Sequence, residues 1–228
     1  MLAAHDRTLF DWSVSSFARY FATERFLFVV RDVAGTPDFV RQSARRLGIR
    51  QAQVVVLDGP TDGQAHTVEL GVSRGQAAHG EPLTIFNIDT IRPGYWQPAI
   101  ASRAAGCLEV FVGKGANWSY VLPASESEPW ALQTAEKQAI SDLCCTGLYH
   151  FATVEHFLSA LRMAAADQQR YLGQLPERYV APLYNYLIER GEPVAYHRID
   201  RGQVTFVGIP SEYDDFLACQ PERMPWAA

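Results

Sequence analysis

The 228-residue sequence is poor in lysine. Of its 20 basic residues, only Lys114 and Lys137 are lysines, and the rest are arginine. It also lacks an apolar run of the roughly 18 to 20 residues that a membrane-spanning helix needs. Its N-terminus does not show the charged and then apolar order of a signal peptide. The formal net charge of -5 disfavours a surface for nucleic acid or anionic membranes. We therefore expect a cytoplasmic protein with neither kind of partner.

Metal-ligand spacing is missing as well. The four cysteines are Cys107, Cys144, Cys145 and Cys219, and the adjacent pair would point to opposite faces of a strand. We interpret them as reduced core thiols. The histidines fit no ligand spacing, and there is no Gly-x-Ser-x-Gly nucleophile turn, so covalent catalysis by the protein is disfavoured.

An apolar content of 48% in 228 residues is enough to bury the core of one globular domain.

The scarcity of lysine makes Lys114 and Lys137 candidates for a functional role. Where arginine has replaced most surface lysines, a retained lysine points to a role that needs a compact ammonium group.

Hydrophobic periodicity predicts alternating helices and strands. The apolar positions from Phe10 to Phe21 share one helical face, and Thr8 with Asp11 predicts a capping box before them. The segment 26–30 (FLFVV) is typical of a fully buried strand. The next helix is predicted to have Thr36 as N-cap, Pro37 as its first residue and Gly48 as C-cap.

Further along the chain we predict a strand at 52–58, a helix at 62–74 and a strand at 83–89 (LTIFNID). This order predicts an α/β fold with a doubly wound, mixed but mostly parallel sheet. The remaining predicted strands are 106–112, 118–122, 131–137, 144–151, 194–199 and 203–209, and the remaining helices are 153–169, 176–190 and 211–218.

Ligands of such sheets bind at the carboxyl ends of the strands. Five polar or glycine residues follow predicted strands there, namely Asp58, Thr61, Gly63, Gln64 and Asp89. We expect them to form one wall of one site.

Five segments, in matching order over nearly the whole chain, resemble the sugar-1-phosphate nucleotidyltransferases, in a branch found in bacterial capsule gene clusters. They are TLFDWSVSSFARYF, LDGPTDGQAHTV, FNIDT, TAEKQAISDLCCTGLYHF and VGIPSEYDDF. The resemblance implies transfer of NMP from an NTP to a sugar phosphate or another small phosphorylated acceptor, with release of pyrophosphate. It also implies a single domain, 1–228, with a nucleotide-binding half, 1–95, and an acceptor-binding half, 96–228.

The resemblance implies roles on the nucleotide side. Asp89 matches the family's Mg²⁺ aspartate, and Mg²⁺ is held by only one or two carboxylates together with substrate phosphates. Gly63 and Gln64 match the loop that contacts the nucleobase, with Asp58 and Thr61 beside it. For Asp89, a turn residue before Pro93 and Gly94 is the alternative, and for Gly63 a capped helix start.

On the acceptor side, AEKQ resembles a Glu-Lys pair in which Glu136 contacts hydroxyls and Lys137 the phosphate. Neighbours on a strand point to opposite faces, so this pair requires a strand end or a bulge. Gly147 and Tyr149 match the wall of the acceptor pocket, which Glu109, Trp118 and Ser119 are expected to line too.

The chain departs from the family at two places. The glycine-rich loop and Lys-Pro that should precede the helix at Thr8 are missing, so we expect a gap in the sheet beside 26–30. We expect the reading frame to continue upstream of Met1, or another segment to fill the gap. The later metal-binding aspartate is also missing from YVAPLYNYLIERG, where the nearest polar candidate is Asn185.

These departures leave a second hypothesis, a nucleotide- or sugar-binding relative without catalysis. A third is a glycosyltransferase of similar fold, which Asp89-Thr90-Ile91 disfavours because such enzymes usually carry Asp-x-Asp. The residues leave the nucleotide, the acceptor and the existence of a homo-oligomer open.

Overall fold

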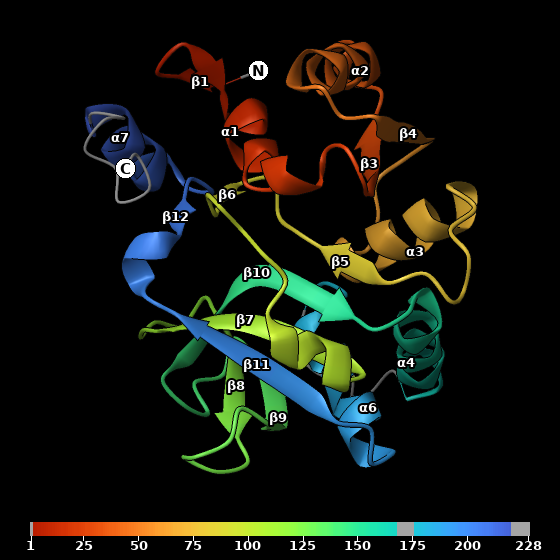
Figure 1. Ribbon diagram of the computed structural model, residues 1–228, viewed down its shortest axis with the longest axis vertical. Helices are drawn as coiled ribbons and strands as arrows, with labels where there is room; N and C mark the ends of the chain where they lie inside the picture. Colours follow the sequence, from red (N-terminus) through yellow and green to blue (C-terminus); the bar gives the residue numbers. More distant parts are fainter. Residues whose placement is uncertain (1, 168–175, 220–228) are drawn as a thin grey trace.

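The computed structural model describes residues 2–167 and 176–219. Its first layer is a two-stranded sheet of β3 (Arg25–Arg31) and β4 (Gln51–Leu57), which pair in parallel. Helix α2 (Thr36–Leu47) connects the two strands, and α3 (Gln64–Arg74) follows β4. Figure 1 shows both helices packed around this strand pair.

Alternate side chains of β3 face the two helices. Phe26, Phe28 and Val30 join the apolar cluster that contains α2 and helix α1 (Leu9–Ser15). On the other face, Gly71 of α3 lies so close to β3 that a Cβ on it would come within 2.5 Å of a Val29 methyl carbon. The parallel strand pair is therefore covered on both faces, as its run of apolar residues predicts.

Helix ends follow the sequence signals closely. The Thr8 hydroxyl accepts a hydrogen bond from the Asp11 amide, which confirms the cap of α1. Gly48 ends α2 in the left-handed conformation, with φ of 81°. The N-cap of α2 is Gly35 rather than Thr36, because the Thr36 hydroxyl turns back to donate to the Val33 carbonyl oxygen.

The main sheet has the strand order β11-β7-β10-β8-β9, with β5 paired to β10 as well. Its strands are β5 (Leu83–Ile85), β7 (Gly106–Val112), β8 (Ser119–Pro123), β9 (Ala131–Glu136), β10 (Leu143–Phe151) and β11 (Val194–Ile199). All nine residues of β10 are buried. Strand β11 is parallel to β7, whereas β10 is antiparallel to β5, β7 and β8, so the fold is a mixed α/β sheet structure.

The core lies between this sheet and the helices α4 (Val154–Ala166) and α6 (Tyr184–Glu189). Cys144 and Cys145 point into different apolar clusters, as adjacent strand residues should. All four cysteines are free thiols, but the expected core position is wrong for Cys219, which is exposed at the end of α7. At the other end, β6 (Thr90–Ile91) pairs with β12 (Thr205–Phe206), and α7 (Pro210–Ala218) follows.

A gap separates the two sheets, as expected beside residues 26–30. Among the described residues β3 pairs only with β4, and β5 only with β10. The expected full burial of 26–30 is therefore wrong, because these residues are only half-buried along the open edge. The expected strand 83–89 also ends early, at Ile85. Figure 1 shows β3 and β5 lying apart.

Three other elements differ from the expected ranges. The first helix stops at Ser15, and residues 18–20 form a separate 3-10 turn. The helix expected at 176–190 is a turn over Ala181–Leu183 followed by α6. The strand expected at 203–209 is reduced to β12, which has only the two-residue β6 as a partner. Residues 168 and 169 of the expected helix 153–169 lie outside the described ranges.

Within the described ranges, no helix is long and apolar enough to cross a membrane.

Candidate functional site

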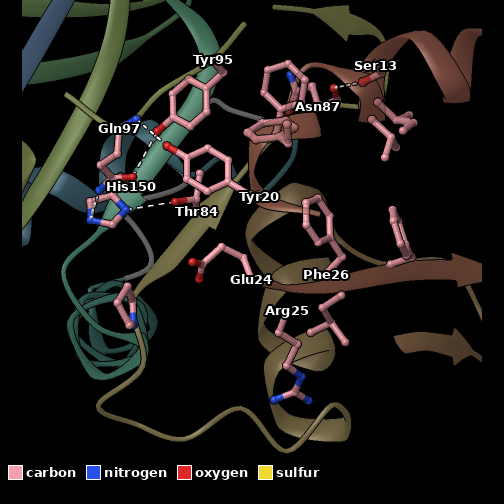
Figure 2. Close-up of a pocket in the computed structure, with 17 residues that line it drawn as sticks. Ser13, Tyr20, Glu24, Arg25, Phe26, Thr84, Asn87, Tyr95, Gln97 and His150 are labelled. Atoms are coloured by element: carbon pink, nitrogen blue, oxygen red, sulfur yellow. Dashed lines mark hydrogen bonds between the residues drawn. The ribbon is translucent and has the colours of Figure 1, made fainter. Parts of the chain in front are cut away.

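Two cavities occupy the gap between β3 and β5. One, of about 470 Å³, meets the aromatic side of β3 at Phe26 and Phe28. The other, of about 510 Å³, meets the aliphatic side at Leu27 and Val29. The first is also lined by Asn87 and the second by Gln64, so both reach the candidate site; Figure 2 shows the first.

One wall of the first cavity is polar. The His150 ring contacts the Thr84 hydroxyl at 3.0 Å through Nδ1 and the Gln97 amide nitrogen at 2.9 Å through Nε2 (Figure 2). Tyr95 donates to the Gln97 side-chain oxygen, and the Gln97 backbone amide donates to the Tyr20 hydroxyl. Burial lowers the pKa of His150 to about 4, so the ring is neutral near pH 7.

Residues 62–67 (DGQAHT), predicted to contact the nucleobase and called here the nucleobase loop, meet two other segments at Gln64, the first residue of α3. The Gln64 amide nitrogen donates to the Asn87 side-chain oxygen. Gly147 on β10 lies against the same asparagine, since a Cβ there would come within 2.6 Å of Asn87 Nδ2. Gly147 has φ of 91° and occupies a shift in the β10–β7 register, so backbone geometry and space both require glycine.

Gly63 is constrained by a segment distant in sequence. The Arg178 amide donates to the Asp62 carbonyl oxygen at 2.6 Å, and the Arg178 carbonyl oxygen accepts from the Ala65 amide at 2.9 Å. A Cβ on Gly63 would lie 2.7 Å from the Arg178 nitrogen, and its φ is 121°. The loop before α3 is thus clamped by backbone hydrogen bonds.

Three side chains near the end of β9, where contacts to the acceptor were predicted, form a hydrogen-bonded chain. The Ser119 hydroxyl donates to a Glu136 carboxylate oxygen, and the Tyr149 hydroxyl lies 3.3 Å from the Ser119 oxygen. Burial raises the pKa of Glu136, although the bond from Ser119 opposes the shift. A half-buried carboxylate held in this way can accept hydrogen bonds from sugar hydroxyls.

Glu136 and Lys137 lie at a strand end, as the Glu-Lys pair requires. Strand β9 ends at Glu136, and Lys137 has φ of 55°, a left-handed conformation that is uncommon for a residue with a side chain. Its amide donates to the Trp118 carbonyl oxygen, and its Nζ donates to the Tyr179 hydroxyl at 2.6 Å. That bond raises the pKa of Lys137, so the ammonium stays charged at neutral pH.

Asp89 follows β5 and lies beside β12. Its backbone oxygen accepts from the Val207 amide, and a Cβ on Gly208 would come within 2.8 Å of its Oδ2. Among the described residues its carboxylate forms no ion pair, and no group of three or more potential metal-ligating side chains is found. The exposed carboxylate fits a Mg²⁺ ion that also takes oxygen ligands from substrate phosphates.

Five other predicted site residues contact neighbouring side chains. The Asp58 carboxylate pairs with Arg74 at 2.9 Å, and Thr61 bonds to Thr67 at the start of α3. The other three were predicted to contact the acceptor: Glu109 is buried against Arg92, Trp118 packs on Phe111 and Phe206, and Asn185 bonds to Thr134.

Sequence reasoning missed three residues of the candidate site. Asn87 lay within the recognised FNIDT segment, so its position was a signal. Arg178 and Tyr179 had no such signal. They reach the site because the chain returns there before the turn at Ala181–Leu183.

No protein-family model matches the chain, and no curated protein matches it. Several solved structures are similar to it. A nucleoside-diphosphate-sugar pyrophosphorylase from Vibrio cholerae is 47% identical, with a TM-score of 0.92 over 96% of this chain and 91% of that one. A proposed glucose-1-phosphate thymidylyltransferase from Bacillus anthracis, in complex with a sucrose, is similar in fold at 14% identity and TM-score 0.71, over 95% and 84% of the two chains.

An inositol-1-phosphate CTP transferase from T. maritima is also similar in fold, with 14% identity and a TM-score of 0.67, over 93% of this chain and 82% of that one.

Proposed function

Because the chain belongs to the nucleoside-diphosphate-sugar pyrophosphorylase family, we propose that it transfers NMP from an NTP to a sugar phosphate or a similar small phosphorylated acceptor. The reaction would join an acceptor phosphate oxygen to the α-phosphate and release pyrophosphate.

One observation carries this proposal: the loop that matches a nucleobase site and the Glu-Lys pair that matches an acceptor site lie on one continuous set of contacts. Gln64 bonds to Asn87, which lies against Gly147, and Arg178 joins the same loop to Tyr179 and Lys137 on the other side. Two substrates that must react with each other need such adjacent sites.

Each side chain then has a role that its chemistry permits. Gly63 and Gln64 would contact the base, since the glycine allows close approach and the amide both donates and accepts. Glu136 would accept bonds from acceptor hydroxyls, and Lys137 would pair with the acceptor phosphate. Asp89 would hold Mg²⁺, which when bound would neutralise charge on the triphosphate.

A second candidate is a relative that binds a nucleotide or sugar without catalysis. It is favoured by the surroundings of Asp89, where the described residues form no group of three or more metal-ligating side chains, and where Val207 and Gly208, which follow β12, lie against Asp89. A metal bound at Asp89 would then depend largely on oxygen ligands from the substrate phosphates.

We further propose that the product is an activated precursor of a bacterial capsule or other surface polysaccharide, made in the cytoplasm where NTPs are available. The support is the resemblance of the five sequence segments. Nothing in the charge or shape of the described residues implies a nucleic acid or membrane partner, and a homo-oligomer is compatible with the proposal.

The test is pyrophosphate release from a panel of CTP, UTP, dTTP, GTP and ATP, each with glucose 1-phosphate, inositol 1-phosphate and phosphocholine, in the presence of Mg²⁺. We expect one combination to exceed the others by at least about tenfold, because a polar pocket discriminates strongly between hydrogen-bonding groups. Binding of a nucleotide by calorimetry without any pyrophosphate release would favour the second candidate. Absence of both binding and release would contradict the two proposals together.

A further inference from the structure

The segment Glu177–Arg178–Tyr179, called here the 177–179 bridge, connects the two proposed substrate sites. On one side the Arg178 backbone forms two hydrogen bonds with the nucleobase loop, to the Asp62 oxygen and from the Ala65 amide. On the other, the Tyr179 hydroxyl accepts from Lys137 Nζ, which also lies 4.9 Å from the centre of the Tyr179 ring.

The bridge is anchored beyond Tyr179. Val180 and Ala181 are fully buried, and the Ala181 carbonyl oxygen accepts from the Thr134 hydroxyl at 2.6 Å. Thr134 belongs to β9, the strand that ends at Glu136, and it is fixed in turn by Asn185. Tyr179 therefore projects from a backbone tied to both the nucleobase loop and the strand that carries the acceptor pair.

Lys137 depends on this contact for its position. Its side chain is exposed, and a flexible four-carbon side chain in water samples many rotamers. The ring and hydroxyl of Tyr179 together provide a cation–π contact and a charge-assisted hydrogen bond. An ammonium group has three donors, so one bond to Tyr179 leaves two for a phosphate.

We propose that Tyr179 is a positioning residue: it holds the Lys137 ammonium for the acceptor phosphate, and through the Arg178 backbone it couples that position to occupancy of the nucleobase loop. The inference rests on the function proposed above. Arg178 is bonded to the loop before α3, and Tyr179 is bonded to Lys137. A shift of that loop would therefore move Arg178 and, with it, the neighbouring Tyr179. Linkage then requires that nucleotide and acceptor change each other's affinity by the same factor.

The scarcity of lysine allows a direct test. A chain labelled with ¹³C at lysine Cε gives signals from Lys114 and Lys137 only, and Lys114→Arg identifies which is which. We would record the pH titration of both signals in the unaltered chain, in Tyr179→Phe and in Tyr213→Phe. The last is a matched control, because it also removes one hydroxyl and one hydrogen bond, here to the Ala3 oxygen at the opposite end of the molecule.

We expect Tyr179→Phe to lower the pKa of Lys137, because the phenylalanine ring keeps the packing but removes the hydrogen bond. Tyr213→Phe should not alter it. An unchanged Lys137 titration in Tyr179→Phe would overturn the positioning role.

The coupling is tested by adding CTP and then glucose 1-phosphate, or the pair that the substrate panel identifies. We expect the nucleotide to shift the Lys137 signal in the unaltered chain and to shift it much less in Tyr179→Phe, with nucleotide affinity by calorimetry kept within about threefold. The KM for the acceptor should rise about tenfold, as expected when one hydrogen bond to a charged group is lost.

The outcomes separate the two proposals. A nucleotide-induced shift of equal size in both proteins would show direct electrostatics and would overturn the coupling, while leaving the proposed function intact. If neither the nucleotide nor any acceptor binds, the proposed function fails and the coupling fails with it.

Discussion

Gly147 lies so close to Asn87 that a Cβ added to it would come within 2.6 Å of the asparagine side-chain nitrogen. The same asparagine accepts a hydrogen bond from Gln64, so a backbone position on β10 determines where the nucleobase loop meets its partner. This contact joins three segments that are far apart in the sequence. It also makes Gly147 a sensitive position at which to test the site.

Gly147→Ala should lower the free energy of unfolding by about 1–3 kcal/mol, because alanine is strained at positive φ and its Cβ displaces Asn87. Gly191→Ala is the matched control: it has φ of 76° but nothing within 4 Å of an added Cβ, so it reports the backbone strain alone. Urea unfolding gives both values, and calorimetry gives the nucleotide affinity. Equal effects of the two substitutions on stability, with unchanged nucleotide affinity, would refute the role of the Asn87 contact.

With the substrate pair that the panel identifies, Asp89→Asn should lower turnover by at least about 10²-fold, since one electrostatic contact to the transition state is removed. The melting temperature should be nearly unchanged, because asparagine keeps the size and the local hydrogen bonding. Asp38→Asn, in an exposed pair with Arg41 on α2, serves as the control for loss of one surface charge. Near-normal turnover with intact Mg²⁺ dependence would remove Asp89 from the metal site.

His150 should make stability depend on pH. Its folded-state pKa of about 4 lies below the ordinary 6.5, so its contribution is fully present above pH 6.5 and is lost as the pH falls towards 4. The Gln97 amide nitrogen can only donate, so Nε2 must accept, and a second proton on the ring would place two donors face to face. Between pH 6.5 and pH 4, the free energy of unfolding should fall by roughly 3 kcal/mol through His150.

Urea unfolding between pH 7 and pH 4 measures this loss, and His150→Gln isolates it from the carboxylates that titrate in the same range. The difference between the two proteins should shrink as the pH falls. Parallel stability curves for the two proteins would show that His150 is not the titrating group.

Hydrogen exchange should distinguish the two edges of β3. In a parallel pair, alternate amides of a strand point to each neighbour, and those of β3 that point away from β4 have no strand partner among the described residues. We expect these to exchange at least about tenfold faster than the amides bonded to β4. Strand β7, paired on both sides by β10 and β11, is the internal control and should be protected throughout. Uniform protection along β3 would mean that its open edge is covered in solution.

Much of the order of elements was predictable from local signals. The cap at Thr8 and the glycine after α2 are short-range devices, and the apolar runs of β3, β4 and β10 are long enough to identify strands. The candidate pairs Gly63–Gln64 and Glu136–Lys137 were predictable from ordered sequence segments. Whether those residues touch a substrate stays a prediction.

Other features were not predictable because they depend on partners distant in sequence. Strand β5 ends at Ile85 although the apolar pattern continues, since only three of its residues pair with β10. The partners of Glu109 and Trp118 are also distant in sequence: Glu109 forms a buried ion pair with Arg92, and Trp118 packs on Phe206.

The sequence by itself determined the family, the mixed α/β class and the residues that mark the two proposed substrate sites, because these are encoded in local pattern and in ordered motifs. Only the tertiary structure decided that the Arg178 backbone clamps the nucleobase loop and that Tyr179 holds Lys137. Such contacts form between segments about 40 or more residues apart. Hydrogen bonds of this kind leave no periodic trace in the chain, since they depend on where the packed core places each backbone.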